Sequence, residues 1–166
     1  MKDFDKIDKC KYLLVTELFE PGENELIIEV CLGSVSEVEE DLFISDTNLG
    51  PAREINFDNK DDVYVIYFDN YISYFVLNAS YDQGTMDEFS GNRIREYKNS
   101  AFIEFCKQET LGFQINIDKI IRHFEIITER HVISVLTTVP PQIKRKENHG
   151  PFASAHNLIK KTFSMY

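Results

Sequence analysis

Carboxylate side chains gather in two short segments of this sequence, and groups of this type can do three kinds of chemistry. They attract a cationic protein, they supply hard oxygen ligands for Ca²⁺, and a spaced pair can act as acid and base on a glycoside. The two segments hold Glu37, Glu39, Glu40, Asp41 and Asp46 in the first, and Asp58, Asp61 and Asp62 in the second.

The spacing of these carboxylates favours the electrostatic role. The second segment lacks the glycine and the distal glutamate of an EF-hand calcium loop. The chain holds 28 acidic residues, so the sequence marks no particular pair of them as an acid and a base. We therefore expect a docking surface for a basic partner. The alternative is a set of solvated loops that keep the chain soluble.

The other residue types that carry chemistry lack the spacing of known sites. No HExxH, GxSxG, P-loop or GxGxxG motif is present, and the cysteines form no CxxC pair. We expect Cys31 and Cys106 to be buried thiols, and His123 and His131 to be solvated or to cap strand ends. The prediction is a protein that is not an enzyme and that holds no metal and no cofactor.

The charge distribution favours a protein over a nucleic acid as the partner. Residues 1–92 hold 21 acidic and 6 basic side chains, a net charge of −15, whereas residues 93–166 hold 7 and 12, a net charge of +5. An acidic surface repels a polyanion, and the basic run Lys144 to Lys146 is short. No stretch has the pattern of a membrane span or a signal peptide, so we expect a cytoplasmic protein with no membrane partner.

Apolar and aromatic runs predict most of the strands in the first half of the chain. Residues 12–19 and 25–32 flank a Pro-Gly turn and predict a hairpin. Residues 63–77 predict a second hairpin with a two-residue turn at Asp69-Asn70, which would pair Phe68 with Tyr71. Because both faces of this hairpin are apolar, we expect its strands to be central in a sheet.

The stretch from Ser34 to Asp62 between these hairpins has weaker signals. Ser36 with Glu39 could cap one helical turn, whereas residues 42–44 suit a short strand equally well. Residues 48–51 contain Gly and Pro and should break the chain. Residues 54–58 alternate polar and apolar side chains, as a half-buried edge strand does.

The second half of the chain predicts a loop, a helix and another hairpin. Residues 81–92 should form a mobile loop, residues 93–97 a brief strand, and Ser100 should cap a helix that runs to Glu109. Residues 123–139 predict a hairpin that turns near residues 129–130 and ends before Pro140-Pro141. The residues that we expect to be buried are Phe68, Phe75, Phe124, Ile126, Ile133 and Val135.

These elements predict an α+β fold with a mainly antiparallel sheet, two clear hairpins and one or two short packed helices. Residues 1–141 should form a single domain. Residues 142–166 should form a basic linker and a short C-terminal helix over residues 154–163, and this segment could dock on the same domain.

Three hypotheses for function follow. An acidic surface next to aromatic strands suits a surface rich in Arg and Lys, and Tyr71, Tyr74 and Tyr81 are the aromatic candidates. This small, acidic, aromatic-rich profile resembles that of bacterial immunity proteins, which implies an antitoxin-type inhibitor that docks on and neutralises a basic toxin. The alternatives are a small-molecule-binding or hydrolytic domain with a pocket between sheet and helix, and a structural protein that self-associates through a sheet edge.

Overall fold

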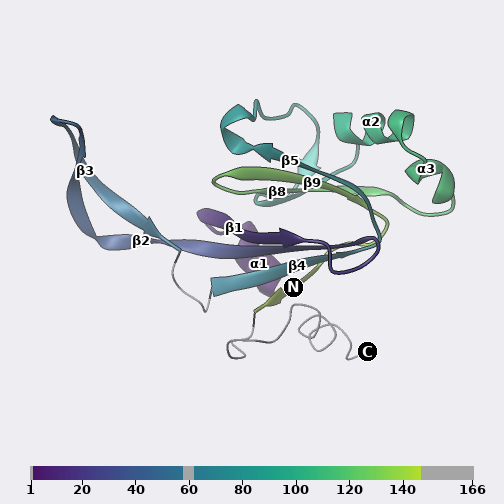
Figure 1. Cartoon of the computed structure of the whole chain (residues 1–166), viewed down its shortest axis with the longest axis horizontal. Coiled ribbons are helices and arrows are strands. Elements are labelled where there is room, and N and C mark those ends of the chain that lie inside the picture. Colours follow the sequence, from purple (N-terminus) through teal and green to yellow (C-terminus); the bar gives the residue numbers. More distant parts are fainter. Residues whose placement is uncertain (1, 58–61, 147–166) are drawn as a thin grey trace.

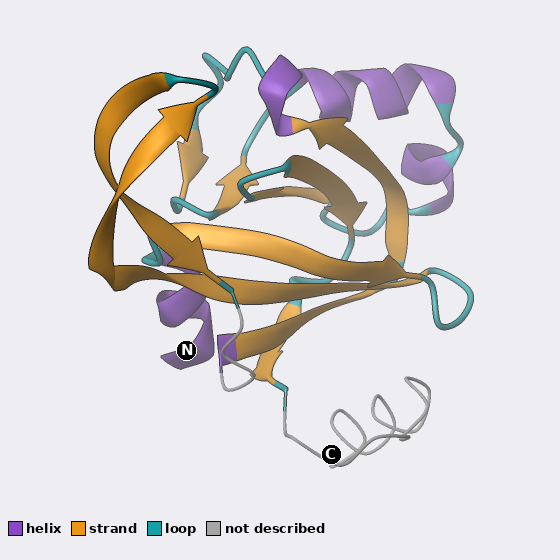
Figure 2. Cartoon of the chain, turned by 60° about the vertical axis from the view of Figure 1, so that its left-hand side comes forward, coloured by secondary structure: helices purple, strands orange, loops and turns teal. Residues whose placement is uncertain are grey.

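Two antiparallel sheets and a few short helices make up the computed structural model, which describes residues 2–57 and 62–146 (Figure 1). The predicted α+β class with mainly antiparallel pairing is confirmed. The facing sides of the two sheets enclose the core, so the molecule is built as two β layers, and the helix Ala101–Glu109 lies over the outer face of the second sheet (Figure 2).

The first sheet contains the predicted hairpin of residues 12–32, which is confirmed by the antiparallel pairing of the first two strands. Its order is β1-β2-β4-β10, and β3 pairs with the distal part of β2. The strands are β1 (Tyr12–Phe19), β2 (Glu25–Ile44), β3 (Thr47–Asn56), β4 (Val63–Asp69) and β10 (Gln142–Arg145).

The second sheet contains the predicted hairpin of residues 123–139, and its register is the predicted one. Phe124 pairs with Val135 and Ile126 pairs with Ile133. The order of this sheet is β5-β9-β8-β7-β6. Its strands are β5 (Tyr71–Asn78), β6 (Phe89–Ser90), β7 (Ile94–Tyr97), β8 (Arg122–Ile127) and β9 (His131–Thr137).

Four short helical segments lie wholly within the described residues. The Ser100 hydroxyl accepts a hydrogen bond from the backbone N–H of Ile103 at 3.1 Å, so the predicted N-cap is confirmed. The helix buries Ile103 and Cys106 against Leu136 of β9, whereas Phe105 is exposed. The segments are α1 (Lys2–Asp8), η2 (Ala79–Tyr81), α2 (Ala101–Glu109) and α3 (Gly112–Ile115).

The core lies between the sheets because each sheet turns alternate apolar side chains toward the other. Phe68 of β4 and Phe124 of β8 meet across the two layers with ring centroids 6.2 Å apart. Five of the six predicted core residues are buried, and the prediction for Phe75 is wrong because this side chain is 52 % exposed. Phe75 points to the outer face of β5, since its neighbour Tyr74 packs on the core.

The predicted hairpin of residues 63–77 is wrong in its pairing, although both strands exist. β4 pairs with β2 and β10 in the first sheet, and β5 pairs with β9 in the second. Asn70 adopts a φ of 59°, which Asn tolerates in a turn, but here it turns the chain from one sheet to the other. β4 is central as expected, whereas β5 lies at a sheet edge.

The prediction of a helical turn at Ser36–Glu39 is also wrong, because β2 continues as one strand to Ile44. The chain reverses at Ser45-Asp46, where Ser45 has a φ of 51°, and not at residues 48–51. Gly50 adopts a φ of 94° inside β3, next to a register shift opposite residues 42–43. The glycine therefore forms a bulge in the strand instead of a break.

The segment after the two prolines differs from the predicted linker. β9 ends at Thr137, before Pro140-Pro141, as predicted. Residues 142–145 then form β10 and pair with β4, with Ile143 opposite Ile66. Apolar Ile143 packs on the core, but the charged run Lys144 to Lys146 follows it directly, which is why composition alone indicated a linker. The predicted helix over residues 154–163 lies outside the described residues.

Candidate functional site

The distal part of β2 leaves the body of the protein and pairs only with β3 (Figure 1). Pairing of β2 with β4 ends at Cys31, and pairing with β1 ends at Gly33. We call residues 34–56, which pair from Ser34–Asn56 to the turn, the arm. The ribbon of the arm curves away from both sheets, so it has no second layer against which to pack.

The boundary between body and arm is tightly packed at Gly33. A Cβ atom built at this position would lie 2.6 Å from the ring of Phe57 and 2.9 Å from the Cβ of Tyr12. Phe57 is held from the other side, because its carbonyl oxygen accepts a hydrogen bond from the Cys31 thiol at 3.1 Å. The glycine therefore lets an aromatic ring close the end of the body where the arm begins.

Six carboxylates and one cation give the arm a formal net charge of −5. The cation, Arg53, pairs with Glu39 at 3.2 Å, and Asn48 donates to Asp41 at 3.2 Å. Within the described residues, no hydrogen bond or ion pair joins the other four carboxylates to another side chain. The six acidic residues are Glu37, Glu39, Glu40, Asp41, Asp46 and Glu54.

Large apolar side chains are exposed among these carboxylates. Phe43 is 57 % exposed and Ile44 is 63 % exposed. Strand alternation places Glu39, Asp41 and Phe43 on one face of the arm, and Glu40, Leu42 and Ile44 on the other. Each face thus mixes charge with apolar area. The exposed apolar residues of the arm are Val35, Val38, Leu42, Phe43, Ile44, Leu49 and Ile55.

Large exposed apolar patches are common at the interaction surfaces of proteins. The sequence indicated a short strand over residues 42–44, and the exposure of these apolar side chains was not predicted. A signal was present in the sequence, since three consecutive apolar residues lie between acidic residues on both sides. A run of that kind cannot place all its apolar side chains on one covered face.

The structure gathers the first group of predicted site residues and disperses the rest. Glu37, Glu39, Glu40, Asp41 and Asp46 are all exposed on the arm. Asp62 is half-buried just before β4, and Asp58 and Asp61 lie outside the described residues.

The three tyrosines lie outside the sheet to which the arm belongs, with Tyr71 and Tyr74 on β5 of the second sheet. Tyr71 and Tyr74 are half-buried against the core, in edge-to-face contact at 5.4 Å, and the Tyr74 hydroxyl donates to Glu20 at 2.9 Å. That bond, with burial, raises the pKa of Tyr74. Tyr81 is exposed at the end of η2. The acidic arm and the tyrosines thus do not share a strand or a sheet.

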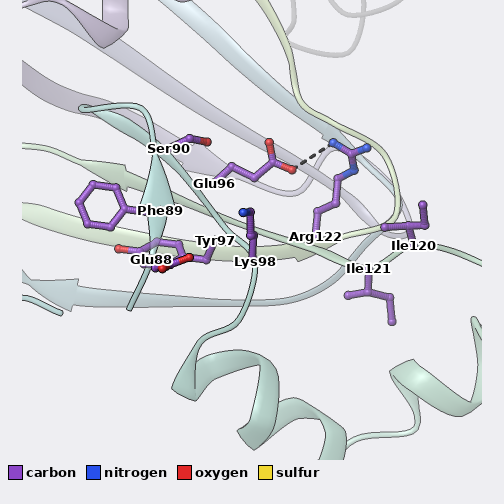
Figure 3. A pocket seen from close by; sticks show the side chains of 9 residues that line it. All are labelled: Glu88, Phe89, Ser90, Glu96, Tyr97, Lys98, Ile120, Ile121 and Arg122. Carbon is purple, nitrogen blue, oxygen red and sulfur yellow. Dashed lines mark hydrogen bonds and ion pairs between the residues drawn. The ribbon is translucent and has the colours of Figure 1, made fainter. Parts of the chain in front are cut away.

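An open groove of about 640 Å³ lies along β6 and β7 on the second sheet (Figure 3). Glu96 and Arg122 form an ion pair at 3.0 Å on its wall, and the Lys98 amine lies nearby. Ile120 exposes most of its side chain at one end. Because the opposite charges on the wall neutralise each other, the groove presents less unbalanced charge than the arm does.

The prediction of a solvated or capping His123 is wrong, because this side chain is 3 % exposed. Burial lowers its pKa from 6.5 to about 4, against the opposing effect of the Asp87 carboxylate. The neighbouring Tyr97 hydroxyl donates to Glu125 at 2.6 Å. Burial and this bond raise the pKa of Tyr97 to about 12. Both rings are therefore neutral at pH 7.

The thiols show no activated site. Cys31 and Cys106 are buried as predicted, and burial raises the pKa of the Cys106 thiol. Among residues 2–57 and 62–146, no group of three His, Cys, Asp or Glu side chains could hold a metal ion. None of the helices in these ranges has the length and apolar composition to cross a membrane. No protein-family model, curated protein or solved structure matches this chain.

Proposed function

We propose that this protein docks on a basic protein partner through the arm and neutralises the surface that it covers. The observation that carries the proposal is the composition of the arm. Its formal net charge is −5, and its apolar side chains are exposed on both faces of a ribbon that extends away from the body. Charge and apolar area are thus presented together at a protruding site.

The two kinds of side chain would serve different steps of binding. Carboxylates that face solvent attract a basic surface over distance and raise the association rate. Apolar side chains such as Phe43 and Ile44 would then be buried in the complex and slow its dissociation. A surface that served only solubility would need the carboxylates but not the exposed apolar residues.

The charge of the arm selects among possible partners. Two arms of formal net charge −5 would repel each other, which disfavours self-association through this edge. A nucleic acid would be repelled for the same reason. The partner that fits is a protein with a basic surface, such as one that itself contacts nucleic acid. Covering that basic surface would inhibit the partner protein. This is the action expected of the antitoxin-type inhibitors that the sequence profile resembles.

The alternative of a small-molecule-binding domain has one specific observation in its favour. A cavity lies between the second sheet and α2, and buried His123 lines it. This cavity belongs to the sheet opposite the arm strands, so the two sites can coexist, and its chemistry is considered below.

Site-specific photo-crosslinking tests the docking proposal. A benzoylphenylalanine replaces Phe43 on the arm in one variant and Phe105 on α2 in the other. The two positions are matched, since both are phenylalanines and are 57 % and 56 % exposed. We expect the arm position to crosslink a basic protein in extracts of the native host at low salt, and the helix position not to.

A charge-reversal variant supplies the control for electrostatics. Replacing Glu37, Glu39, Glu40 and Asp41 by Lys should abolish the crosslink from position 43. The proposal is wrong if both positions capture the same proteins, if the captured protein has an acidic surface, or if the crosslink survives charge reversal.

A further inference from the structure

A cavity of about 280 Å³ lies between the outer face of the second sheet, the start of α2 and residues 82–87. The strand register explains its floor. Glu125 of β8 pairs with Arg95 of β7 on one side and with Ser134 of β9 on the other. Ser134 pairs in turn with Phe75 of β5. A row of three polar residues that ends at Phe75 therefore crosses the sheet on the face turned away from the core.

The adjacent row contains His123, which pairs with Tyr97. The His123 ring stacks on Tyr97 at 4.7 Å and meets the edge of Phe102 at 5.3 Å, so its orientation is fixed. Neither ring nitrogen has a hydrogen-bond partner among the described residues. A buried polar group without a partner costs free energy, and one that lines a cavity indicates a ligand that completes its hydrogen bonds.

The walls of the cavity are acidic. The carboxylates of Glu125, Asp82 and Asp87 line it. The Glu125 carboxylate already has partners within the protein, because it accepts hydrogen bonds from Tyr97 and Ser134 at 2.6 and 3.2 Å.

The two loop carboxylates differ from Glu125. Asp82 accepts a hydrogen bond from the backbone N–H of Gly84 at 3.0 Å, whereas no side chain of the described residues pairs with the Asp87 carboxylate. Asp87 and His123 line the same cavity, and the charge of Asp87 opposes the lowering of the His123 pKa by burial. The nearby cation, Arg95, lies within 3.7 Å of Glu125 and over the Phe89 ring.

This combination excludes some ligands by charge and size. Three carboxylates disfavour an anion. A volume of about 280 Å³ lies at the lower limit for small-molecule pockets, so a nucleotide would not fit. The rings of Phe75, Tyr97 and Phe102 favour a cation with an aliphatic chain, because they offer both apolar contact and π faces.

We propose that this cavity binds an alkylammonium or alkylguanidinium group, with Asp87 as its counter-ion and a neutral His123 nitrogen as a hydrogen-bond acceptor. The neutral imidazole does not repel a cation. The site is independent of the arm and of the docking function. The cationic group could come from a free small amine or from a Lys or Arg side chain of a protein, and both sources share this chemistry.

Nuclear magnetic resonance of histidine-labelled full-length protein tests the proposal. The probes are butylammonium and butylguanidinium, with butyrate and butanol as anionic and neutral controls of similar size. We expect saturable shifts of the His123 imidazole resonances with the two cations only. Resonances of His123 are assigned by their loss in His123→Gln. A Gly-Gly-Lys-Gly-Gly peptide distinguishes the sources, since it shifts His123 only if the site accepts a protein side chain.

Two loop residues provide a matched pair of variants. Asp87→Asn should weaken butylammonium binding by about 3- to 10-fold, whereas Glu88→Gln, which removes a neighbouring charge outside the cavity, should change it less than about 2-fold. Both residues are exposed, so folding should not be affected. Equal effects of the two substitutions would overturn the proposal, as would equal shifts with butyrate, or no His123 shift with either cation.

Discussion

The two parts of β2 differ in the strands that surround them and in their exposure. Residues 25–32 have β1 on one side and β4 on the other, and all positions from Leu26 to Cys31 are buried. Residues 34–44 have only β3 beside them, and almost all are exposed. Both parts contain apolar side chains. The neighbouring strands, and not the strand itself, therefore decide whether an apolar residue stabilises the fold or remains available to a partner.

This contrast has an energetic basis. A two-stranded ribbon in water is marginally stable by itself, whereas a strand within a packed sandwich contributes to one cooperative core. We therefore expect substitutions in residues 25–32 to change stability, and substitutions in the arm to change binding.

The largest expected effect comes from the same substitution at two positions of β2. Ile28→Ala removes a side chain that is 0 % exposed and should lower the free energy of unfolding by about 2–5 kcal/mol. Ile44→Ala removes one that is 63 % exposed and should lower it by less than about 0.5 kcal/mol. Urea denaturation measures both. Comparable losses would mean that the arm packs on something that stabilises the fold.

A pH-dependent loss of stability should arise from His123, which lies in the body of the protein and not in the arm. His123 has a pKa of about 4 when folded and 6.5 in its ordinary state. Between these values the unfolded chain binds a proton that the folded chain does not. Stability is therefore complete above about pH 6.5 and falls as the pH decreases to about 4, by roughly 3 kcal/mol at 1.4 kcal/mol per pH unit.

Replacement of this histidine isolates its effect. His123→Phe keeps an aromatic ring beside Tyr97 and should flatten the pH dependence relative to the wild type. Urea denaturation at several pH values between 4 and 7 compares the two proteins. An unchanged slope in the variant would show that His123 is not the group that titrates.

The boundary between the two parts of β2 should be sensitive to one added methyl group. Gly33→Ala places a Cβ 2.6 Å from the Phe57 ring, and overpacking of this kind costs about 1–3 kcal/mol. The double variant with Phe57→Leu should recover part of the loss, because it removes the atoms that clash. A double-mutant cycle by urea denaturation measures the coupling between the two substitutions. Strictly additive losses would show that the Phe57 ring is not the group that clashes with the added methyl group.

The smallest effect is expected from the ion pair within the arm. Glu39 and Arg53 are about half exposed, so their pair should contribute at most about 1 kcal/mol. Glu39→Gln should leave the midpoint of urea denaturation nearly unchanged. Raising the salt concentration to 1 M should lower the stability of this variant little further. A large loss of stability would indicate that the arm depends on its own electrostatics.

Most of the elements of the fold could be predicted from the sequence, and the failures have a common cause. Periodicity identified the strands of residues 12–32 and 123–139, and the second was correct in register because its turn is local. The pairing of residues 63–77 was wrong because Asn70 can turn a hairpin or a corner between sheets with the same backbone conformation. Local signals do not distinguish these two outcomes.

The candidate sites were only partly predictable. The acidic residues of the arm were identified by their density, but their exposure depends on the absence of a second layer, which no local pattern encodes. His123 lies near a strand start, as the sequence indicates, but its burial results from Tyr97 and from Phe102 of α2, which are distant in sequence. Its role could not be predicted without the register of β7 and β8.

The central claim is that the carboxylates of the arm steer a basic partner to this site. The most direct measurement is the association rate with the protein crosslinked from position 43. It compares the wild type with the variant in which Glu37, Glu39, Glu40 and Asp41 are replaced by Lys. A control with the same charge change elsewhere replaces the exposed residues Asp5, Glu88, Glu109 and Asp118 by Lys.

At low salt the arm variant should associate about 10- to 100-fold more slowly than the wild type, and the control variant should lose much less. At physiological ionic strength the difference should shrink, because charges are screened beyond about 8–10 Å. Equal association rates for the arm variant and the wild type at low salt would contradict the claim and leave the carboxylates as solubility groups.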